Sequence, residues 1–430
     1  PHITNEEIVS LKDRPSSDAA YLLFRKFITP EEIPNTDLRE LVDDAYNYGF
    51  PLEHLEKRQY MLMHTEGPTG DFKNTGARAN ARLLSMLSEP YKQYIRVTTT
   101  SGDTGGAVGV ADSGVPRLHS LLLYPKGRVS NVQEQIMRTG GDNVYPIAVQ
   151  KASFSDIQDG MGKIALGDIE LREELAKINF GLMSGNSINW GRLMPQIAHY
   201  LYSYAQLANI GEPVVFVTPM GNGGHGLAGE YFRRMVDFDV FSVWPTNEND
   251  VLPRYMVSDV HRPLTDVEFV VCKSCSMDVK MPSNNMRLFY LFGGIVAKDG
   301  RVFVRPDKNE MRKHIFSTQV TRKMEEQTII EFYQRHRIPI EPHTACMVNG
   351  MWQYLEREGP QNDTLIIGQS TAHKYKFHEY LNELLGVQIE KPDIYKRLDG
   401  LKETGMDMEF GYDNLKRFIL EIASEHHKNG

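Results

Sequence analysis

The chain has 430 residues, of which 41% are hydrophobic and 24% are charged, and its formal net charge at pH 7 is −8. This size and ordinary composition predict a soluble globular protein of two or three domains with substantial cores. The acidic balance and the absence of a basic stripe argue against nucleic-acid binding, and no hydrophobic run approaches the roughly 18 residues that a membrane helix needs. We therefore expect neither nucleic acid nor a membrane as a partner.

The cysteines indicate a reducing compartment. Cys272, Cys275 and Cys346 cannot build a disulfide framework, and their odd number suits the cytoplasm. The spacing Cys272-x-x-Cys275 also occurs in zinc and redox sites, but no second Cys/His pair at a finger-like spacing accompanies it. We therefore expect a cytoplasmic protein without a metal site.

The first 60 residues are predicted to form an N-terminal helical extension. Ser16-Ser17-Asp18 and Asn35-Thr36-Asp37 are expected to cap two of its helices, because short polar side chains accept hydrogen bonds from the first amides of a helix. The next segment, Gln59–His64, is predicted to be a short apolar strand. This strand leads into the stretch around which we expect the chain to be organised.

That stretch contains Lys73, which follows the turn-rich run Gly67–Gly70 and precedes a helix-compatible segment from about Ala77. Burial and the positive end of the following helix would favour the free amine, which is the form that makes a Schiff base. A lysine beside a glycine turn is usually a surface lysine. The interpretation therefore depends on two glycine loops downstream, Thr100–Gly106 and Gly221–Gly226.

From Ala81 to Gln150, helix-compatible and strand-compatible segments alternate, which predicts a parallel sheet with crossover helices. The loop TSGDTGG at Thr100–Gly106 follows one of these strands and precedes a helix. Ligands bind beyond the carboxyl ends of parallel strands, so this loop is expected at a binding site.

A second strand, loop and helix follow later. A helical stretch is predicted for Trp190–Leu207, and the strand Val214–Pro219 leads into GNGGHG and a helix through Arg233; a late strand is expected at Leu365–Gly368. Consecutive amides in such a loop bind phosphate, with a structural turn as the alternative, and the spacing is not that of a dinucleotide fingerprint. An available lysine amine and a phosphate cradle in an α/β enzyme point to pyridoxal 5′-phosphate.

A series of short motifs in fixed order makes this interpretation specific: GPTxxFK, TSGDTG, LYPKGRVS, NSINWGR, TPMGNGG, TNENDVLPR, SCSMD, EPHTA and STAHKYKF. Over about residues 50–385 the chain resembles the threonine synthase family, within the tryptophan synthase β class of pyridoxal-phosphate enzymes. The resemblance implies fold type II, an α/β fold with two open, twisted, mostly parallel sheets flanked by helices. It also implies a smaller substrate-side domain at 81–190 and a larger cofactor-binding domain made of 61–80 with 191–430.

The resemblance also implies site residues. Lys73 matches the Schiff-base lysine and Phe72 lies beside it, while Asp103 and Thr104 match the loop that meets the 3-hydroxyl side of the cofactor and the carboxylate of the substrate. The expected cofactor-binding residues are Lys73, Phe72, Asp103, Gly221, Asn222, Gly223, Gly224, His225 and Thr371. Thr371 matches the hydroxyl that bonds the pyridine nitrogen, and His225 is expected to cap the loop or touch the cofactor phosphate rather than act as an acid or base.

The implied substrate is O-phosphohomoserine, a small phosphorylated amino acid. The expected substrate-binding residues are Ser101, Thr104, Asn186, Ser187, Arg192 and, more weakly, Arg78. A planar guanidinium and short polar donors suit phosphate oxygens, whereas the alternative for Arg192 is a solvated helix arginine. The implied reaction is the lyase-type conversion of this substrate and water to threonine and phosphate, by a monomer or a homodimer.

The chain departs from the family pattern at a few positions. Asp71 and Asn74 stand where the family usually has Ala and Asp, His225 ends the glycine loop, and Lys374 replaces a proline. Asp71 is expected either to favour the protonated amine of Lys73 or to point to solvent. These departures keep other functions open: a phosphoserine β-replacement such as that of cysteate synthase, a phospholyase, or a non-catalytic homologue that binds an anion or a partner protein.

Overall fold

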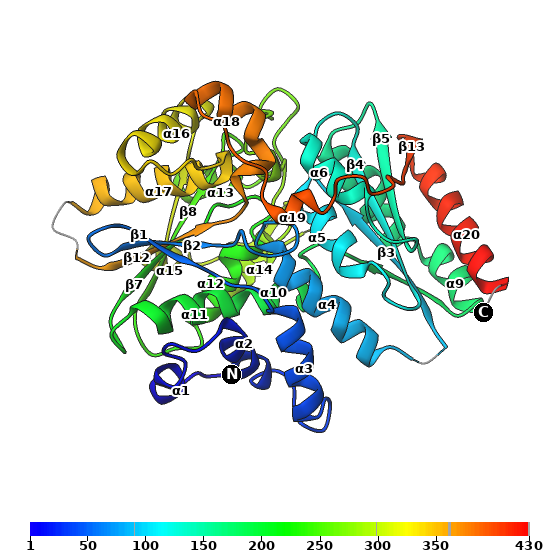
Figure 1. The fold of residues 1–430 in the computed structure, drawn as a ribbon, viewed down its shortest axis with the longest axis horizontal. Coiled ribbons are helices and arrows are strands. Elements are labelled where there is room, and N and C mark those ends of the chain that lie inside the picture. The colour runs from blue at the N-terminus through cyan, green and yellow to red at the C-terminus, as the bar shows by residue number, and fades with distance from the viewer. Residues whose placement is uncertain (90, 298, 360–362, 429–430) are drawn as a thin grey trace. The chain divides into compact units, whose positions relative to one another are not determined.

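The computed structural model describes residues 1–89, 91–297, 299–359 and 363–428, and Figure 1 shows their course. The chain divides into two compact units. Unit 1 comprises Pro1–Thr75 and Leu193–Glu390, and unit 2 comprises Gly76–Arg192 and Lys391–Gly430. Within the described residues, no helix combines the length and apolar character that a membrane crossing requires.

The described part of unit 1 contains a six-stranded sheet in which all neighbouring strands are parallel except β1 and β2. Its strands, in order across the sheet, are β1 (Leu52–Glu56), β2 (Gln59–Met63), β12 (Leu365–Ser370), β7 (Val214–Val217), β8 (Val240–Thr246) and β11 (Ile315–Gln319). Every residue of β7 and β12 is buried, as expected for strands with helices on both faces. A separate hairpin pairs β9 (Ile295–Val296) with β10 (Val302–Val304).

Helices cover both faces of this sheet (Figure 1). The helices of unit 1 are α1 (Asn5–Val9), α2 (Ser16–Arg25), α3 (Asn35–Ala45), α11 (Ile197–Leu207), α12 (Gly224–Arg233), α13 (Val251–Ser258), α14 (Asn285–Leu291), α15 (Lys308–His314), α16 (Arg322–His336), α17 (Pro342–Glu358) and α18 (His378–Leu385), with 3-10 turns at Met194–Gln196, Cys275–Met277 and Lys374–Phe377. Successive residues of β7 point to opposite faces: Val215 and Val217 belong to the core cluster of α16 and α17, whereas Phe216 meets Tyr200 of α11 and Phe232 of α12.

The N-terminal extension contains three helices, but its predicted caps are wrong, because the residues predicted as caps lie inside the first turn. Helices α2 and α3 begin at Ser16 and Asn35, directly after Pro15 and Pro34, and neither has a side-chain cap. A proline fixes its own backbone and supplies no side-chain acceptor, so the polar residues that follow lie inside the first turn. The range predicted to be helical also includes β1, which is a strand.

The described part of unit 2 contains a five-stranded sheet in which all neighbours are parallel. In order across the sheet, its strands are β13 (Met406–Glu409), β5 (Val144–Gln150), β4 (Leu118–Pro125), β3 (Gln93–Thr99) and β6 (Phe180–Ser184). The helices are α5 (Asp103–Asp112), α6 (Asn131–Arg138), α7 (Phe154–Ile157), α8 (Lys163–Gly167), α9 (Ile169–Lys177), α19 (Asp393–Lys396) and α20 (Tyr412–Lys428), with a π-helical turn at Gln158–Gly162. Helix α4 (Lys73–Leu87) starts in unit 1 and continues into unit 2, and α10 (Trp190–Leu193) spans the second boundary.

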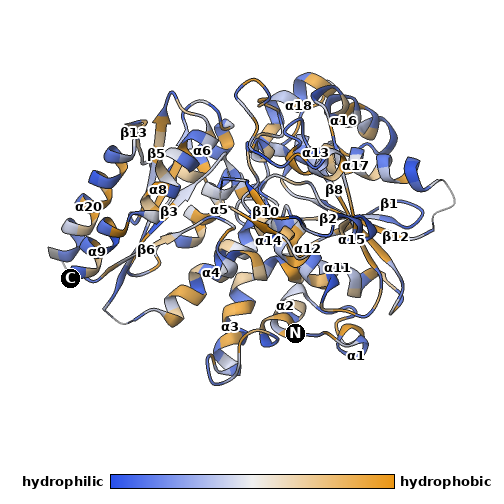
Figure 2. Cartoon of the chain, turned by 180° about the vertical axis from the view of Figure 1, so that it is seen from behind, coloured by the Kyte–Doolittle hydropathy of each residue, from blue (hydrophilic) through white to orange (hydrophobic). Residues whose placement is uncertain are grey.

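The C-terminal segment 391–430 differs in placement from the sequence-based expectation, which put it in the larger cofactor-binding domain. In the structure this segment belongs to unit 2, where β13 pairs in parallel with β5. Leu415, Ile419 and Ile422 form the buried face of α20 and join the core cluster of this sheet, and Figure 2 shows hydrophobic and hydrophilic residues mixed along the helix. The amphipathic pattern predicts a buried face but does not say which sheet it covers.

Candidate functional site

In unit 1, the segment Gly67–Lys73, which we call the lysine turn, is attached to the end of β12. The amide of Phe72 donates to the carbonyl of Thr371 over 3.1 Å, and the amide of His373 donates to the carbonyl of Gly70 over 2.7 Å. Asp71 also forms an isolated β-bridge with Ala372. Lys73 and Thr371, about 300 positions apart in the chain, are thereby held at the carboxyl end of one parallel sheet, where ligands bind in such folds.

Lys73 is the first residue of α4, and Asp71 holds the start of that helix. One carboxylate oxygen of Asp71 accepts the Lys73 amide over 2.9 Å, and the other pairs with Nζ of Lys376 over 2.6 Å and accepts the Thr69 hydroxyl over 2.8 Å. The side chains of Asp71 and Lys376 are buried. The expectation that Asp71 points to solvent is therefore excluded, because its carboxylate faces Lys376 and the backbone of Lys73.

The glycine loop Gly221–Gly226, which follows β7, is a tight turn that ends at the N-terminus of α12. Gly223 has φ of +79° and precedes α12, whose N-terminus has no side-chain cap. A Cβ on Gly221 would lie 2.8 Å from the carbonyl oxygen of Ser276, so no side chain fits there. The carbonyl of Asn222 accepts the Asn284 amide, and its side-chain oxygen accepts the Ser283 amide. The loop is therefore fixed on one side by the 276–284 segment and presents the first amides of α12.

His225 connects this loop to the lysine turn. Its imidazole stacks on the ring of Phe72, with centroids 4.5 Å apart and planes 9° apart, and Nζ of Lys73 lies 4.4 Å from the centroid of the same phenyl ring. Burial lowers the pKa of His225 well below its usual value, with smaller effects from His64 and Lys73. His225 is therefore neutral at physiological pH, which agrees with a positioning role in the loop.

These residues of unit 1 fit pyridoxal phosphate. Lys73 supplies an amine and Thr371 a hydroxyl, and both are held by the same turn. A Cβ on Gly221 would meet Ser276 and one on Gly223 would meet Met220, so the loop approaches its neighbours closely, and it presents backbone amides of the kind that bind a phosphate group.

In unit 2, the loop Thr100–Gly106 joins β3 to α5. Gly102 has φ of +135°, and the hydroxyl of Thr100 accepts the amides of Gly102 and Gly105 over 2.9 Å each. Asp103 is buried and accepts a hydrogen bond from Nε2 of Gln133 over 2.9 Å. Its neighbours Ser101 and Thr104 are half-buried. The predicted loop is thus a tight turn that presents these side chains at the carboxyl end of β3.

The predicted phosphate residues of unit 2 follow β6. The side-chain amide of Asn186 is bonded to the backbone of Thr99, donating over 2.7 Å and accepting over 3.2 Å, so it fixes the loop to the end of β3. Ser187 is half-buried. Arg192 is 1% exposed, and one of its Nη atoms donates to the carbonyl of Gly185. The alternative of a solvated helix arginine is therefore excluded for Arg192, whereas Arg78 on α4 is half-buried.

Three buried groups near these residues were not predicted from the sequence. They are the partner of Asp71, Lys376; the ion pair between Arg96 of β3 and Asp112 of α5; and the histidine cluster His64, His199 and His225, of which only His225 was considered. Lys376 lies in the STAHKYKF motif, which is a signal that sequence reasoning had in view. Arg96 is a charged residue in the middle of a strand pattern, and such a residue requires a buried partner.

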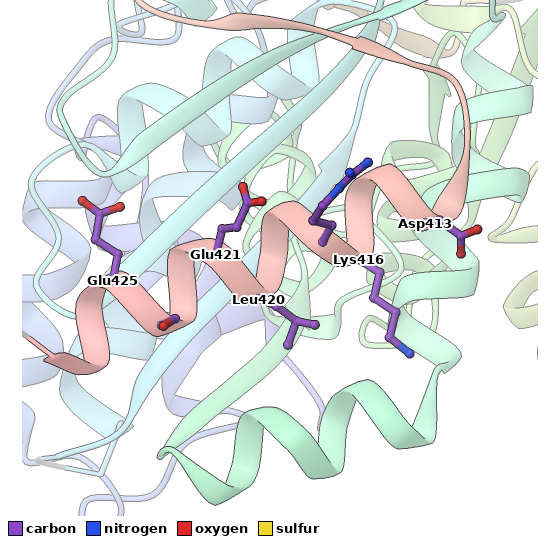
Figure 3. A pocket seen from close by; sticks show the side chains of 7 residues that line it. Asp413, Lys416, Leu420, Glu421 and Glu425 are labelled. Carbon is purple, nitrogen blue, oxygen red and sulfur yellow. The ribbon is translucent and has the colours of Figure 1, made fainter.

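A shallow hollow on α20 of unit 2 does not have the character of a catalytic site. The side chains that line it, Asp413, Lys416, Leu420, Glu421 and Glu425 among them, all come from this one helix (Figure 3). They carry charges of both signs and include none of the predicted site residues. We therefore read this hollow as a solvated helix face.

Comparison with known proteins assigns the family. No family model matches the chain. The chain is 32% identical over 391 residues to a threonine synthase of Haemophilus influenzae, covering 91% of this chain and 85% of that protein, and 31% identical to one of Schizosaccharomyces pombe, covering 89% and 82%. Among solved structures, a threonine synthase of Brucella melitensis with bound pyridoxal phosphate matches with a TM-score of 0.85 and 26% identity over 100% of this chain and 92% of that chain.

A threonine synthase from yeast matches nearly as well, with a TM-score of 0.84 and 26% identity over 99% of this chain and 92% of that chain. These matches confirm the predicted fold type II and the predicted cofactor. On the evidence of its relatives and of its fold, the chain belongs to the threonine synthase family of pyridoxal-phosphate enzymes.

Proposed function

We propose that this chain converts O-phosphohomoserine and water to threonine and phosphate with pyridoxal 5′-phosphate as cofactor. The observation that carries the proposal is the attachment of Lys73 and Thr371 to one another through the lysine turn and the end of β12, in a chain of this family. When bound, the cofactor withdraws electrons from the carbon atoms next to the substrate's amino group.

The residues of unit 1 are proposed to bind the cofactor and to move protons. The amine of Lys73 would hold the cofactor covalently and, once released, take and return protons at Cα and Cβ of the substrate. Asp71 and Lys376 would keep this lysine in place, because Asp71 bonds its backbone amide. The loop Gly221–Gly224 would bind the cofactor phosphate through backbone amides, and the Thr371 hydroxyl would bond the pyridine nitrogen, leaving it largely unprotonated.

In unit 2 the residues bind the substrate. Arg192 and Ser187 are proposed to hold its phosphate group, Arg78 is a weaker candidate for the same anion, and Ser101, Asp103 and Thr104 are proposed to meet the amino-acid end and the cofactor. The buried position of Arg192 supports this role, because a guanidinium surrounded by protein binds an anion more strongly than one in water. Asn186 would contribute mainly by fixing the loop to Thr99.

The test measures phosphate release and threonine formation together with purified protein and O-phosphohomoserine. We expect equal amounts of both products, and loss of activity by at least about 10³-fold in Lys73→Ala, since the variant lacks both the covalent anchor and the proton carrier. Lys323→Ala, an exposed lysine on α16 of the same unit, is the matched control and should keep full activity. An Arg192→Ala variant with an unchanged rate would contradict the role given to that residue.

Other products identify the alternatives. Phosphate with 2-oxobutyrate would indicate a phospholyase in which water addition fails. Turnover of phosphoserine, with or without sulfite, but not of O-phosphohomoserine would indicate a β-replacement enzyme. A colourless protein that cannot be loaded with cofactor would indicate a non-catalytic homologue, and it would contradict the proposal outright.

A further inference from the structure

Three buried histidines of unit 1 come together beside the cofactor loop. His64 follows β2, His199 lies in α11 and His225 is in the first turn of α12. They are 1%, 2% and 3% exposed, and each offers a ring nitrogen within 4.8 Å of those of the other two. The proposed reaction uses His225 only as part of the loop and does not use the other two. The cluster therefore needs an explanation of its own.

Hydrogen bonds on the outer side orient two of the rings. Nε2 of His64 lies 2.8 Å from Oε1 of Gln369, and Nε2 of His199 lies 2.9 Å from Oγ1 of Thr75. With the proton on Nε2, each ring keeps the lone pair of Nδ1 available. Histidines that bind metals have this arrangement, in which the nitrogen that does not bind the metal donates to another residue.

Nitrogen atoms in the cluster also lack partners. Nδ1 of His64 and Nδ1 of His225 are buried and have no hydrogen-bond partner among the described residues. A buried polar atom without a partner costs free energy, so such atoms are uncommon unless a ligand or a water satisfies them. Nδ1 of His64 is therefore a candidate ligand atom that lacks a partner, whereas the cluster contact of His225 is made by its other nitrogen, Nε2.

The spacing is that of metal ligands. Nδ1 of His199 and Nε2 of His225 form a hydrogen bond 3.3 Å long, and a metal bound by both rings would replace that bond. In a tetrahedral zinc site with Zn–N bonds of about 2.0–2.1 Å, two nitrogen ligands lie about 3.3–3.4 Å apart. The remaining nitrogen is within 4.8 Å, so a side-chain movement on the order of 1 Å completes the set.

We propose that His64, His199 and His225 bind a divalent cation of the zinc class, with a water or hydroxide in the fourth position. Three imidazoles suit a borderline ion such as Zn²⁺ or Co²⁺, whereas Ca²⁺ and Mg²⁺ require oxygen ligands. A bound hydroxide would reduce the buried charge. The bound ion would tie the start of α12, and with it the cofactor loop, to β2 and α11. This site differs from the sequence-based expectation of no metal.

The experiment uses the full chain without an affinity tag, dialysed against chelator and then against Zn²⁺, with the metal content measured by elemental mass spectrometry. We expect about one Zn²⁺ per chain, and an at least tenfold lower affinity in each of His64→Gln, His199→Gln and His225→Gln. His261→Gln is the matched control, because His261 is also buried in unit 1 but lies outside the cluster; its metal content should equal that of the unsubstituted chain.

Spectroscopy keeps the test independent of how well the variants fold. Co²⁺ in place of Zn²⁺ should give visible absorption typical of four-coordinate geometry, and X-ray absorption on the zinc form should show about three imidazole ligands. The proposal is overturned if the unsubstituted chain retains no Zn²⁺, if the ligands seen are not imidazoles, or if the three cluster variants bind as much metal as His261→Gln. Because none of these readouts is turnover, failure here leaves the proposed reaction untouched.

Discussion

Among the described residues, Asp71 and Lys376 form a buried ion pair in unit 1 and Arg96 and Asp112 form one in unit 2, and the two pairs differ in how well their polar atoms are satisfied. In unit 1, the Asp71 carboxylate bonds Lys376, the Thr69 hydroxyl and the Lys73 amide. In unit 2, Arg96 pairs with Asp112, but Nε and Nη2 of Arg96 and Oδ2 of Asp112 have no hydrogen-bond partner in the described structure.

The difference bears on the role proposed for the unit 1 pair, which lies next to Lys73. Burial costs both pairs a large desolvation free energy, and only good geometry with further hydrogen bonds repays it. The unit 1 pair meets that condition and holds the first turn of the helix that begins at Lys73, the proposed catalytic residue. In unit 2, burial raises the pKa of Asp112 even though Arg96 lowers it, so the pair only partly compensates its own cost.

The largest effect should come from breaking the satisfied pair. Replacing Lys376 by Met leaves the Asp71 charge buried without its cation, so we expect unfolding to become easier by about 3–5 kcal/mol. Denaturant unfolding followed by circular dichroism measures this loss. A double variant, Lys376→Met with Asp71→Asn, should recover part of it, and a single variant as stable as the parent chain would show that the pair contributes nothing.

Replacing both members of the unit 2 pair should leave the free energy of unfolding unchanged or increase it. In Arg96→Met with Asp112→Leu, both charges and their unsatisfied atoms are removed together, and we expect a neutral effect or a stabilisation of up to about 1–4 kcal/mol. The same unfolding measurement compares this variant with the corresponding unit 1 double variant. If the unit 2 variant loses as much stability as Lys376→Met, the distinction between the two pairs is wrong.

The buried carboxyl group of Glu325 extends the comparison to the dependence of stability on pH. Burial raises the pKa of Glu325 from 4.5 to about 7, although the Ser274 hydroxyl donates to it. The folded state then holds a proton that the unfolded state has lost between pH 4.5 and 7, so this group makes stability fall as pH rises through that window. Glu325→Gln should flatten the decrease by roughly 1–3 kcal/mol, seen as the difference in unfolding free energy between pH 5 and pH 8. If the stability of Glu325→Gln changes with pH as much as that of the parent chain, Glu325 is not the cause of the decrease.

The sequence predicted the local elements around the site better than their long-range partners. The strands before both glycine loops, the loops and the lysine turn follow from turn residues and apolar runs that act over a few positions. The pairing of Asp71 with Lys376 joins segments 305 positions apart, and the attachment of α20 to the unit 2 sheet is equally non-local. Neither feature can be predicted from sequence periodicity. A periodic pattern indicates that one face of an element is buried, but it does not identify the residues that cover that face.

The caps of α2 and α3 failed for a different reason. Ser16 and Asn35 have the right chemistry for a cap, but Pro15 and Pro34 already occupy the position before the first turn. Polar composition at a helix start therefore locates the first turn, and the identity of the preceding residue decides where the helix begins.

The smallest effect on stability, and a specific one on the cofactor, is expected at Gly223. Its φ of +79° disfavours any residue with a Cβ by about 1 kcal/mol, and the added atom would lie 3.2 Å from Met220. Gly386→Ala is the matched control, because Gly386 also has positive φ, of +64°, but has no atom within 4 Å of the added Cβ. Both variants should lose similar stability. Only Gly223→Ala should weaken the binding of pyridoxal phosphate, measured by cofactor absorbance during titration, because only Gly223 shapes the start of α12. Equal cofactor affinity in the two variants would mean that the loop does not hold the phosphate.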